Sequence, residues 1–511
     1  MSAVRRTLPE RPSLEQQKTL AKELLTAYRS DDREAIARVR AQLPDKKRIV
    51  LADAQLVIAR EYGFRSWNEL RTRIESLRVD TLPPMERFKT AVQAGDAQAL
   101  RRVLQAHAEV RAAINEPVFP FDSPALVAAS DVNVVDVLLE FGADPNRRST
   151  WWAGGFHPLH GARGAVAQRL MAGGSIPDAC AAANLDRADL LERMLADDPQ
   201  RVHERGGDGK LPLHFARSRR VVDLLLDAGA DVDARDIDHR STAAEWMLGD
   251  DPDDARRDLA KYLVERGASA DIFLAAALGI TDRARTLLDR NPSLLALRTS
   301  QGDYAEKPPS SYHIYQWTIG PNFTPLQVAA KFGQRETLEA MLQFAPPEQR
   351  LLLACHEGRA AEARDIVHAD PGIVERLEGA DRRALTDEAW AANAPAVELM
   401  MELGFDPAAS SVSGPTGGTA LHCASWQGCV ACVRAILAYD RGRALVEAVE
   451  STYGGTPLSW CSHGARNSGD TAADHVGVAR LLIGAGARPS AELLAHWDVI
   501  QVVLDEAAAQ K

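Results

Sequence analysis

Apolar residues recur with helical spacing along most of the chain. In Asn133–Asn146, which reads NVVDVLLEFGADPN, valine and leucine fall at positions i, i+3 and i+4, the spacing that places side chains on one face of a helix. A glycine follows each such stripe, and glycine readily adopts the left-handed conformation that ends a helix. The pattern therefore predicts a series of amphipathic helices closed by glycine turns. The other stretches of this kind are Arg220–Ala234, Asp258–Ala270, Val397–Pro407 and Val478–Pro489.

A shorter, alanine-rich segment precedes many of these helices. Small side chains on such a segment let two helices approach each other closely, so we expect pairs of helices with the short member first. The segments are LVAASD from Leu126, LPLHFARS from Leu211, TPLQVAAKFG from Thr324, TALHCASWQG from Thr419 and TPLSWCSHG from Thr456.

Together, these two segment types resemble the ankyrin repeat. The opening T-P-L-H-x-A, the closing V-x-x-L-L-x-x-G-A-D-x-N and a period near 33 residues are that family's pattern, and His160, His214 and His422 occupy its histidine position. The resemblance implies an all-α solenoid of about twelve helix-pair repeats over residues 85–490, with helical caps at both ends. We expect the N-terminal cap in the basic residues 1–80 and a C-terminal capping helix in residues 491–511.

A second type of unit lacks the TPLH opening and ends in an Asp-Pro or Asn-Pro turn. Pro199, Pro292 and Pro371 follow its helices, at a point where proline cannot continue them. The alternation of the two unit types resembles the multi-repeat ankyrin proteins of bacteria. So does the leader Gln55–Glu75, which reads QLVIAREYGFRSWNELRTRIE.

Composition narrows the class of protein further. Hydrophobic residues make up 46% and charged residues 26% of the chain, a globular balance. With 60 Lys and Arg against 71 Asp and Glu, the net charge of −11 argues against nucleic-acid binding. No apolar run reaches the ~18 to 20 residues of a membrane span, and no secretory signal precedes the repeats, so we expect a cytoplasmic protein without a membrane partner.

Three segments interrupt the repeat pattern, and functional sites tend to lie where a sequence departs from its own rule. They are the insertions at about 149–156 (STWWAGGF), 299–323, which is the longest and is rich in tyrosine, and 462–474. In addition, Trp246, Trp390 and Trp460 each follow a helix-opening threonine by four residues. First helices line the concave face of an ankyrin stack, so these rings either line a binding groove or fill the core between repeats.

Two functions follow from these departures. The first is a scaffold that recognises a protein partner through an aromatic-rich concave face, because tryptophan and tyrosine dominate interface energetics. The alternative is a small-molecule-binding protein or enzyme, with a pocket closed by the 299–323 insert over the groove and with Asp470 among its polar groups. The predicted binding residues are Trp151, Trp152, His157, Tyr312, His313, Tyr315, Trp317, Trp426, Trp460 and His463.

The sequence favours neither a metal site nor a known catalytic motif. His422, Cys423, Cys429, Cys432, Cys461 and His463 lie close together in sequence, but we interpret the cysteines as small buried hydrophobes on helices rather than as zinc ligands. Cys461 and His463 are two residues apart on a helix and so point in different directions. Phosphate-binding, nucleophile-elbow and dinucleotide motifs are absent from the sequence, so we predict no cofactor and leave catalysis open.

Overall fold

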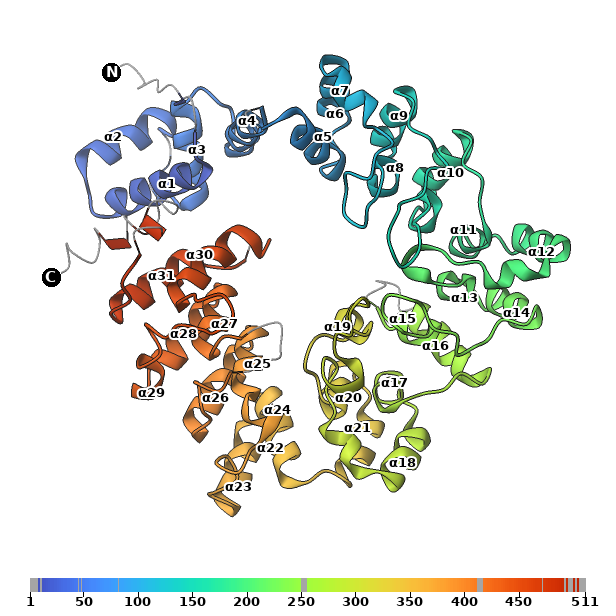
Figure 1. Cartoon of the computed structure of the whole chain (residues 1–511). Coiled ribbons are helices and arrows are strands. Elements are labelled where there is room, and N and C mark those ends of the chain that lie inside the picture. The colour runs from blue at the N-terminus through green and yellow to red at the C-terminus, as the bar shows by residue number, and fades with distance from the viewer. Residues whose placement is uncertain are drawn as a thin grey trace. The chain divides into compact units, whose positions relative to one another are not determined.

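In the computed structural model, the described residues form helices joined by turns and loops (Figure 1). The structure describes residues 8–9, 12–44, 46, 48–80, 82–249, 255–410, 417–470, 472–490, 493–494, 500 and 503–504. These residues contain no strand, only three isolated bridges within turns, so the predicted all-α class is confirmed. The chain divides into two compact units, unit 1 (residues 1–215) and unit 2 (residues 216–511).

The first four helices of unit 1 form a small cluster around their own core. Ser13 and Asp32 cap the first two helices by accepting hydrogen bonds from backbone N–H groups, as expected of residues at helix starts. Val39, Ile58 and Leu70 are buried between the helices. The role of this cluster as a cap stays a prediction. The helices are α1 (Leu14–Arg29), α2 (Arg33–Gln42), α3 (Leu51–Glu61) and α4 (Trp67–Asp80).

The rest of unit 1 consists of successive helix pairs, and from residue 125 onward the second helix of a pair is longer than the first. Phe88, Leu104, Leu138 and Leu170 lie in a continuous core between the pairs. The elements are α5 (Pro84–Gln93), α6 (Ala97–Ala106), α7 (Ala108–Ala112), α8 (Ala125–Ala128), α9 (Val132–Glu140), η1 (Pro158–His160), α10 (Gly164–Ala172), α11 (Ala179–Asn184), α12 (Ala188–Asp197), η2 (Pro199–His203), η3 (Gly207–Gly209) and α13 (Pro212–Phe215).

Unit 2 continues the helix pairs. Its elements up to residue 342 are α14 (Arg219–Asp227), α15 (Ala243–Trp246), α16 (Ala255–Glu265), α17 (Ile272–Leu278), α18 (Thr281–Arg290), η4 (Pro292–Ala296), η5 (Gly302–Tyr304), α19 (Tyr315–Thr318), α20 (Pro325–Lys331) and α21 (Arg335–Leu342). They are followed by α22 (Pro347–His356), α23 (Ala360–Ala369), α24 (Gly379–Arg382), α25 (Ala384–Trp390), α26 (Ala394–Leu403), α27 (Ala420–Trp426), α28 (Val430–Leu437), α29 (Asp440–Arg443), α30 (Pro457–Asn467) and α31 (His475–Gly484).

The threonines that open the first helices fix where these helices begin. Thr242, Thr324 and Thr456 each accept a hydrogen bond from a backbone N–H in the first turn and complete a capping box. The first helices α25, α27 and α30 then pack side by side, and the second helices α26, α28 and α31 form the layer behind them, in the orange and red part of Figure 1. This order explains how aromatic residues far apart in sequence come together in unit 2.

The structure shows more helix in the last interruption than expected, and it describes only part of the predicted C-terminal cap, which stays a prediction. Residues 462–467 belong to α30, so the helix extends into the 462–474 interruption. In the predicted C-terminal capping helix, Leu493, Ile500 and Val503 are buried, and the other residues of 491–511 except Leu494 and Leu504 lie outside the described residues. None of the described helices is both long enough and apolar enough to cross a membrane.

Candidate binding site in unit 2

Four aromatic side chains from three neighbouring first helices stack on one another in unit 2. We call Trp390, Trp426, Trp460 and His463 the aromatic row. Trp426 lies in its centre: its ring centroid is 6.2 Å from that of Trp390 and 5.1 Å from that of His463, and both pairs are stacked, at interplanar angles of 27° and 25°. Trp460 meets Trp426 edge-on at 6.1 Å. The row therefore combines an inner ring, Trp460, with half-buried tryptophans and an exposed histidine.

The position of Trp426 is fixed by tight backbone packing. Its carbonyl oxygen accepts a hydrogen bond of 2.9 Å from Nε2 of His475. A Cβ atom on Gly464 would lie 2.1 Å from the same oxygen, so only glycine lets α30 approach the end of α27 this closely. Gln427, the next residue, donates from its side-chain amide to the carbonyl oxygen of Trp390. These contacts hold neighbouring tryptophans in register.

A cavity of about 370 Å³ opens beside Trp390. Gln427 and Asp470 line it from the later repeats, and residues 321–323 line it from the end of the long insert. We call it the Trp390 cavity. The Trp390 cavity brings together Trp390, the end of the long insert and the last loop, all of which the sequence had singled out. Most of the polar residues that line the cavity were not among the predicted residues.

A histidine–glutamate pair forms one wall of the Trp390 cavity. Nδ1 of His356 lies 2.8 Å from Oε1 of Glu388, and Asn393 donates to Oε2 of Glu388 at 2.7 Å. Burial lowers the pKa of His356, but the hydrogen bond with Glu388 and the charge of that carboxylate raise it by more, so the net pKa is above its ordinary value. The ring of Phe323 meets His356 edge-on at 5.6 Å.

Two buried polar atoms of residues that line this cavity have no hydrogen-bond partner in the protein. Arg298 is almost fully buried and donates to Asp381 at 2.6 Å and to the carbonyl oxygen of Asn322 at 2.8 Å, but its Nε has no hydrogen-bond partner. Asp387 accepts from Arg383 at 2.9 Å through Oδ1, while its Oδ2 is also without a partner. Burial raises the pKa of Asp387, although the neighbouring arginine charges oppose this. Both unpaired atoms belong to residues that line the Trp390 cavity.

The long insert folds onto earlier repeats of unit 2. The N–H of Ser311 donates to the carbonyl oxygen of Asp238 at 3.0 Å, and the N–H of Ile314 donates to the hydroxyl of Ser241 at 3.1 Å. A hydrogen bond of 2.8 Å joins Nδ1 of His239 to the carbonyl oxygen of Tyr312. The insert is therefore an ordered part of the repeat stack.

A second cavity, of about 510 Å³, lies where the insert meets α15 and α17, and its polar side chains bond to one another. The hydroxyls of Tyr304 and Tyr315 donate to the two oxygens of Asp271, at 2.8 and 2.9 Å. Nε2 of His313 lies 3.4 Å from Glu245. Burial raises the pKa values of Asp271 and of both tyrosines. This network holds the insert in place.

The predicted residues of the insert therefore differ in accessibility. His313 and Tyr315 are buried, with Tyr315 wholly inside the core, whereas Tyr312 is half-buried. Trp317 is 63% exposed and lies outside both cavities. Tyr315 and His313 have almost no surface to offer a partner, so our proposal does not use them.

The predicted aromatic residues of unit 1 form a separate cluster. Trp151 contacts Trp152 with centroids 6.0 Å apart and meets Phe121 edge-on at 5.4 Å. Trp152 is 44% exposed and Phe121 52% exposed. His157 is buried, and its Nδ1 accepts from the N–H of Leu159, so it shapes the turn before η1. Burial lowers its pKa to about 4.

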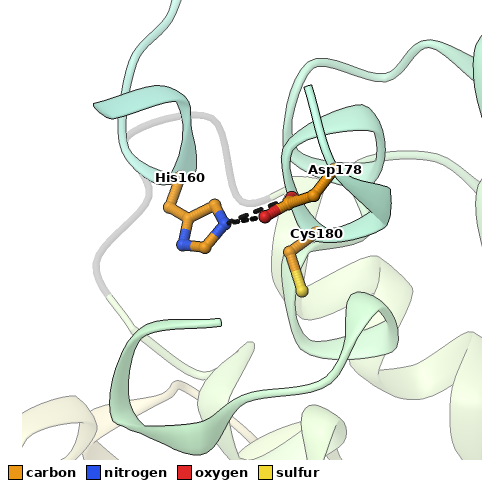
Figure 2. A group of neighbouring side chains, drawn as sticks. All are labelled: His160, Asp178 and Cys180. Atoms are coloured by element: carbon orange, nitrogen blue, oxygen red, sulfur yellow. Dashed lines mark hydrogen bonds and ion pairs between the residues drawn. The ribbon is translucent and has the colours of Figure 1, made fainter. Parts of the chain in front are cut away.

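Figure 2 shows a cluster of unit 1 whose side chains are of metal-binding type, His160, Asp178 and Cys180. Nε2 of His160 lies 2.9 Å from Asp178, and Nδ1 of His160 accepts from the N–H of His157 at 3.2 Å. Asp178 also caps α11 by accepting from the N–H of Ala181. Burial raises the pKa of Cys180 well above its ordinary value, so this thiol keeps its proton. The ring nitrogens of His160 and the carboxylate of Asp178 are used in hydrogen bonds that connect successive repeats. We therefore assign the cluster a structural role, the linking of these repeats.

The cysteines only partly match their interpretation as buried hydrophobes. Cys180, Cys355, Cys423, Cys432 and Cys461 are buried. Cys429 is the exception, because it is the N-cap residue of α28 and is only half-buried. The sequence could have predicted the partial exposure of Cys429. The helical pattern begins at Val430, so Cys429 directly precedes the helix and occupies its capping position.

Comparison with known proteins agrees with this architecture. The family model of the ankyrin repeat matches residues 208–237, the stretch that contains LPLH and the following GAD turn. With the successive helix pairs described above, the chain is an ankyrin-repeat protein. No curated protein matches the chain. The number of repeats and the resemblance to bacterial members stay predictions.

Proposed function

We propose that the aromatic row and the Trp390 cavity of unit 2 form the surface through which this chain recognises a protein partner. An ankyrin repeat indicates a protein–protein interaction scaffold. The observation that supports this particular surface is the stack of Trp390, Trp426 and His463 beside a cavity with unsatisfied polar atoms. Large rigid rings next to a pocket are the usual composition of an interface hot spot.

The chemistry of the cavity favours a basic side chain of the partner. Asp387, Glu388 and Asp470 contribute carboxylates to its lining, and Oδ2 of Asp387 has no protein partner. Among the described residues of the lining, Arg298 is paired with Asp381, Asp387 with Arg383 and Glu388 with His356, so the carboxylate of Asp470 leaves the cavity with a net negative charge. A lysine or arginine inserted here would pair with Asp387 and lie against the indole of Trp390, where cation–π attraction adds about 0.5 to 2 kcal/mol.

Selection from a random-peptide phage library on the full-length chain tests this proposal without a known partner. We expect the selected peptides to share a Lys or Arg next to apolar residues. Trp426→Ala should weaken the binding of these peptides by at least about 30-fold, the effect of losing a hot-spot ring. Asp387→Asn should weaken binding chiefly for peptides that contain the basic residue.

Trp317→Ala is the matched control, because it removes an exposed tryptophan of the same unit that lies outside the row and both cavities. It should bind the peptides as the wild type does. Far-UV circular dichroism checks that each variant keeps its helices. Peptides without a shared basic residue, or binding that survives Trp426→Ala and is lost in Trp317→Ala, would refute the assignment.

The alternative of a small-molecule site or enzyme rests on the insert, which lines both cavities. We prefer protein recognition because the groups that catalysis would use in the second cavity, His313, Glu245 and Asp271, are hydrogen-bonded within the protein. Binding of a small molecule would shift the ring resonances of His313, and a fragment screen read out by NMR at this residue separates the two functions.

A further inference from the structure

A pair of thiols lies at the start of α28, three residues after Trp426 of the aromatic row. Cys429 is the N-cap residue of this helix, and Cys432 is in its first turn. The two Sγ atoms are 2.7 Å apart, and the N–H of Cys432 also donates to Sγ of Cys429 at 3.3 Å. The spacing C-x-x-C at a helix start thus brings both sulfurs together without any movement of the backbone elements.

The two sulfurs differ in environment in the way that a redox pair requires. Cys429 is half-buried and can meet a small oxidant, whereas Cys432 is buried behind it. The hydrogen bond from Cys432, together with backbone N–H groups at the helix start, lowers the pKa of Cys429 to about 6, against the effect of burial. The same hydrogen bond and burial raise the pKa of Cys432.

The remaining cysteines lack this environment. Cys180, Cys355, Cys423 and Cys461 are all buried. Burial raises the pKa of Cys355 to about 12 and also raises the pKa of Cys180 and of Cys461. Since the thiolate is the reactive form, Cys429 should react before these four cysteines do.

We infer that Cys429 and Cys432 form a reversible dithiol–disulfide site that is oxidised by peroxides, with Cys429 as the attacking thiolate and Cys432 as the resolving thiol. The thiolate of Cys429 attacks one oxygen of hydrogen peroxide, the O–O bond breaks, and the leaving hydroxide takes up a proton to become water. Cys429 is then a sulfenic acid.

In the second step Sγ of Cys432 attacks Sγ of Cys429. The S–S bond forms, the S–O bond breaks, and hydroxide leaves as water with the proton of Cys432. Two thiols and one peroxide thus give one disulfide and two waters. The sulfurs must approach by only about 0.7 Å to reach the bond length of about 2.05 Å, and a dithiol reductant reverses the reaction by exchange.

Peptide mapping of the native full-length chain tests the inference. The protein is treated with hydrogen peroxide, quenched, unfolded, alkylated and cleaved with chymotrypsin, which separates Cys423 from the pair by cutting after Trp426. We expect the peptide that contains Cys429 and Cys432 to have no alkyl group and to be two hydrogen atoms lighter than the free dithiol form, and dithiothreitol to restore alkylation of both cysteines. Alkylation of the reduced protein by iodoacetamide should reach half its maximal rate at Cys429 near pH 6.

Three variants distinguish this chemistry from general oxidation. Cys432→Ser should leave Cys429 as a sulfenic acid that dimedone traps, and should raise the pH midpoint of its alkylation. Cys429→Ser should lower the oxidation rate of Cys432 at least about tenfold. Cys355→Ser, a buried cysteine outside the pair, should oxidise as the wild type does, and circular dichroism checks the fold of all three.

The inference is overturned if both thiols stay alkylatable after peroxide treatment, or if Cys180, Cys355, Cys423 or Cys461 oxidises as fast. Sulfinic acid at Cys429 of the wild-type chain, without a disulfide, would remove Cys432 from its resolving role. The site does not depend on the proposed protein recognition, because the mapping uses no partner.

Discussion

Replacement of Gly464 by alanine should destabilise unit 2 and loosen the aromatic row. The added Cβ would lie 2.1 Å from the carbonyl oxygen of Trp426 and 2.9 Å from Nε2 of His475. Real Cβ atoms essentially never come within 3.0 Å of such neighbours. The backbone of α27 or α30 must therefore shift by about 1 Å, and overpacking of this kind costs about 1 to 3 kcal/mol.

Two further effects set the net magnitude. Alanine is better than glycine inside a helix by about 1 kcal/mol, which opposes the clash. Displacing the carbonyl oxygen also weakens its hydrogen bond from His475, a loss of about 1 kcal/mol. Because the clash is with backbone rather than with a flexible side chain, we take the upper part of the overpacking range; the two further effects cancel, so we expect a net loss of about 3 kcal/mol.

Urea unfolding followed by circular dichroism and by tryptophan fluorescence measures this loss. Gly484→Ala is the matched control, because Gly484 ends α31 and an added Cβ would meet no atom within 4 Å. This control should unfold at the same or a higher urea concentration than the wild type. The reasoning is refuted if Gly464→Ala is as stable as the wild type, or if the two variants lose the same stability.

Three other outcomes follow from the structure. Asp271→Ala removes two tyrosine hydrogen bonds to a charged group, each worth about 1.5 to 3 kcal/mol, so chymotrypsin should cleave inside residues 299–323 at least tenfold faster. Folding raises the pKa of His356 above the unfolded value of about 6.5. The protonated ring therefore stabilises the folded state below about pH 6.5, and this stabilisation is lost as the pH rises through the pKa of the folded state. Replacing the ring in His356→Gln should lower the urea midpoint more at about pH 5.5 than at about pH 9. For His157 the pKa is lowered to about 4, so an NMR titration of its ring should show a neutral imidazole at about pH 6.

Periodicity and turn residues were sufficient to predict the helix pairs of this chain. The stripe in Asn133–Asn146 corresponds to α9, and the threonine before TPLQ corresponds to the N-cap of α20. Both signals act over one or two helical turns and are therefore visible in a single sequence. The same holds for Trp426 and Trp460, whose positions in the repeat bring them onto neighbouring helices.

The polar residues of the Trp390 cavity lacked such a signal. Arg298 pairs with Asp381, which is 83 residues later, and Asn322 bonds to Asp387 at a separation of 65 residues. These separations are about two and a half and about two repeat periods, so no short-range sequence pattern links the partners. Likewise, His463 stacks on Trp426 of the preceding first helix and not on Trp460, three residues before it, because Gly464 lets α30 approach α27 closely.

The anchoring of the long insert has a consequence for how unit 2 unfolds. In a plain repeat array each repeat contacts only its neighbours, so repeats at an end can melt singly. Here residues 311 and 314 bond to residues 73 positions earlier, and two tyrosines of the insert bond to Asp271. Opening any one of these repeats breaks bonds in the others. The helices α15, α17 and α20 should therefore open together, as one cooperative block. In hydrogen exchange, their amide protons should report the same free energy of opening, whereas other repeats open separately.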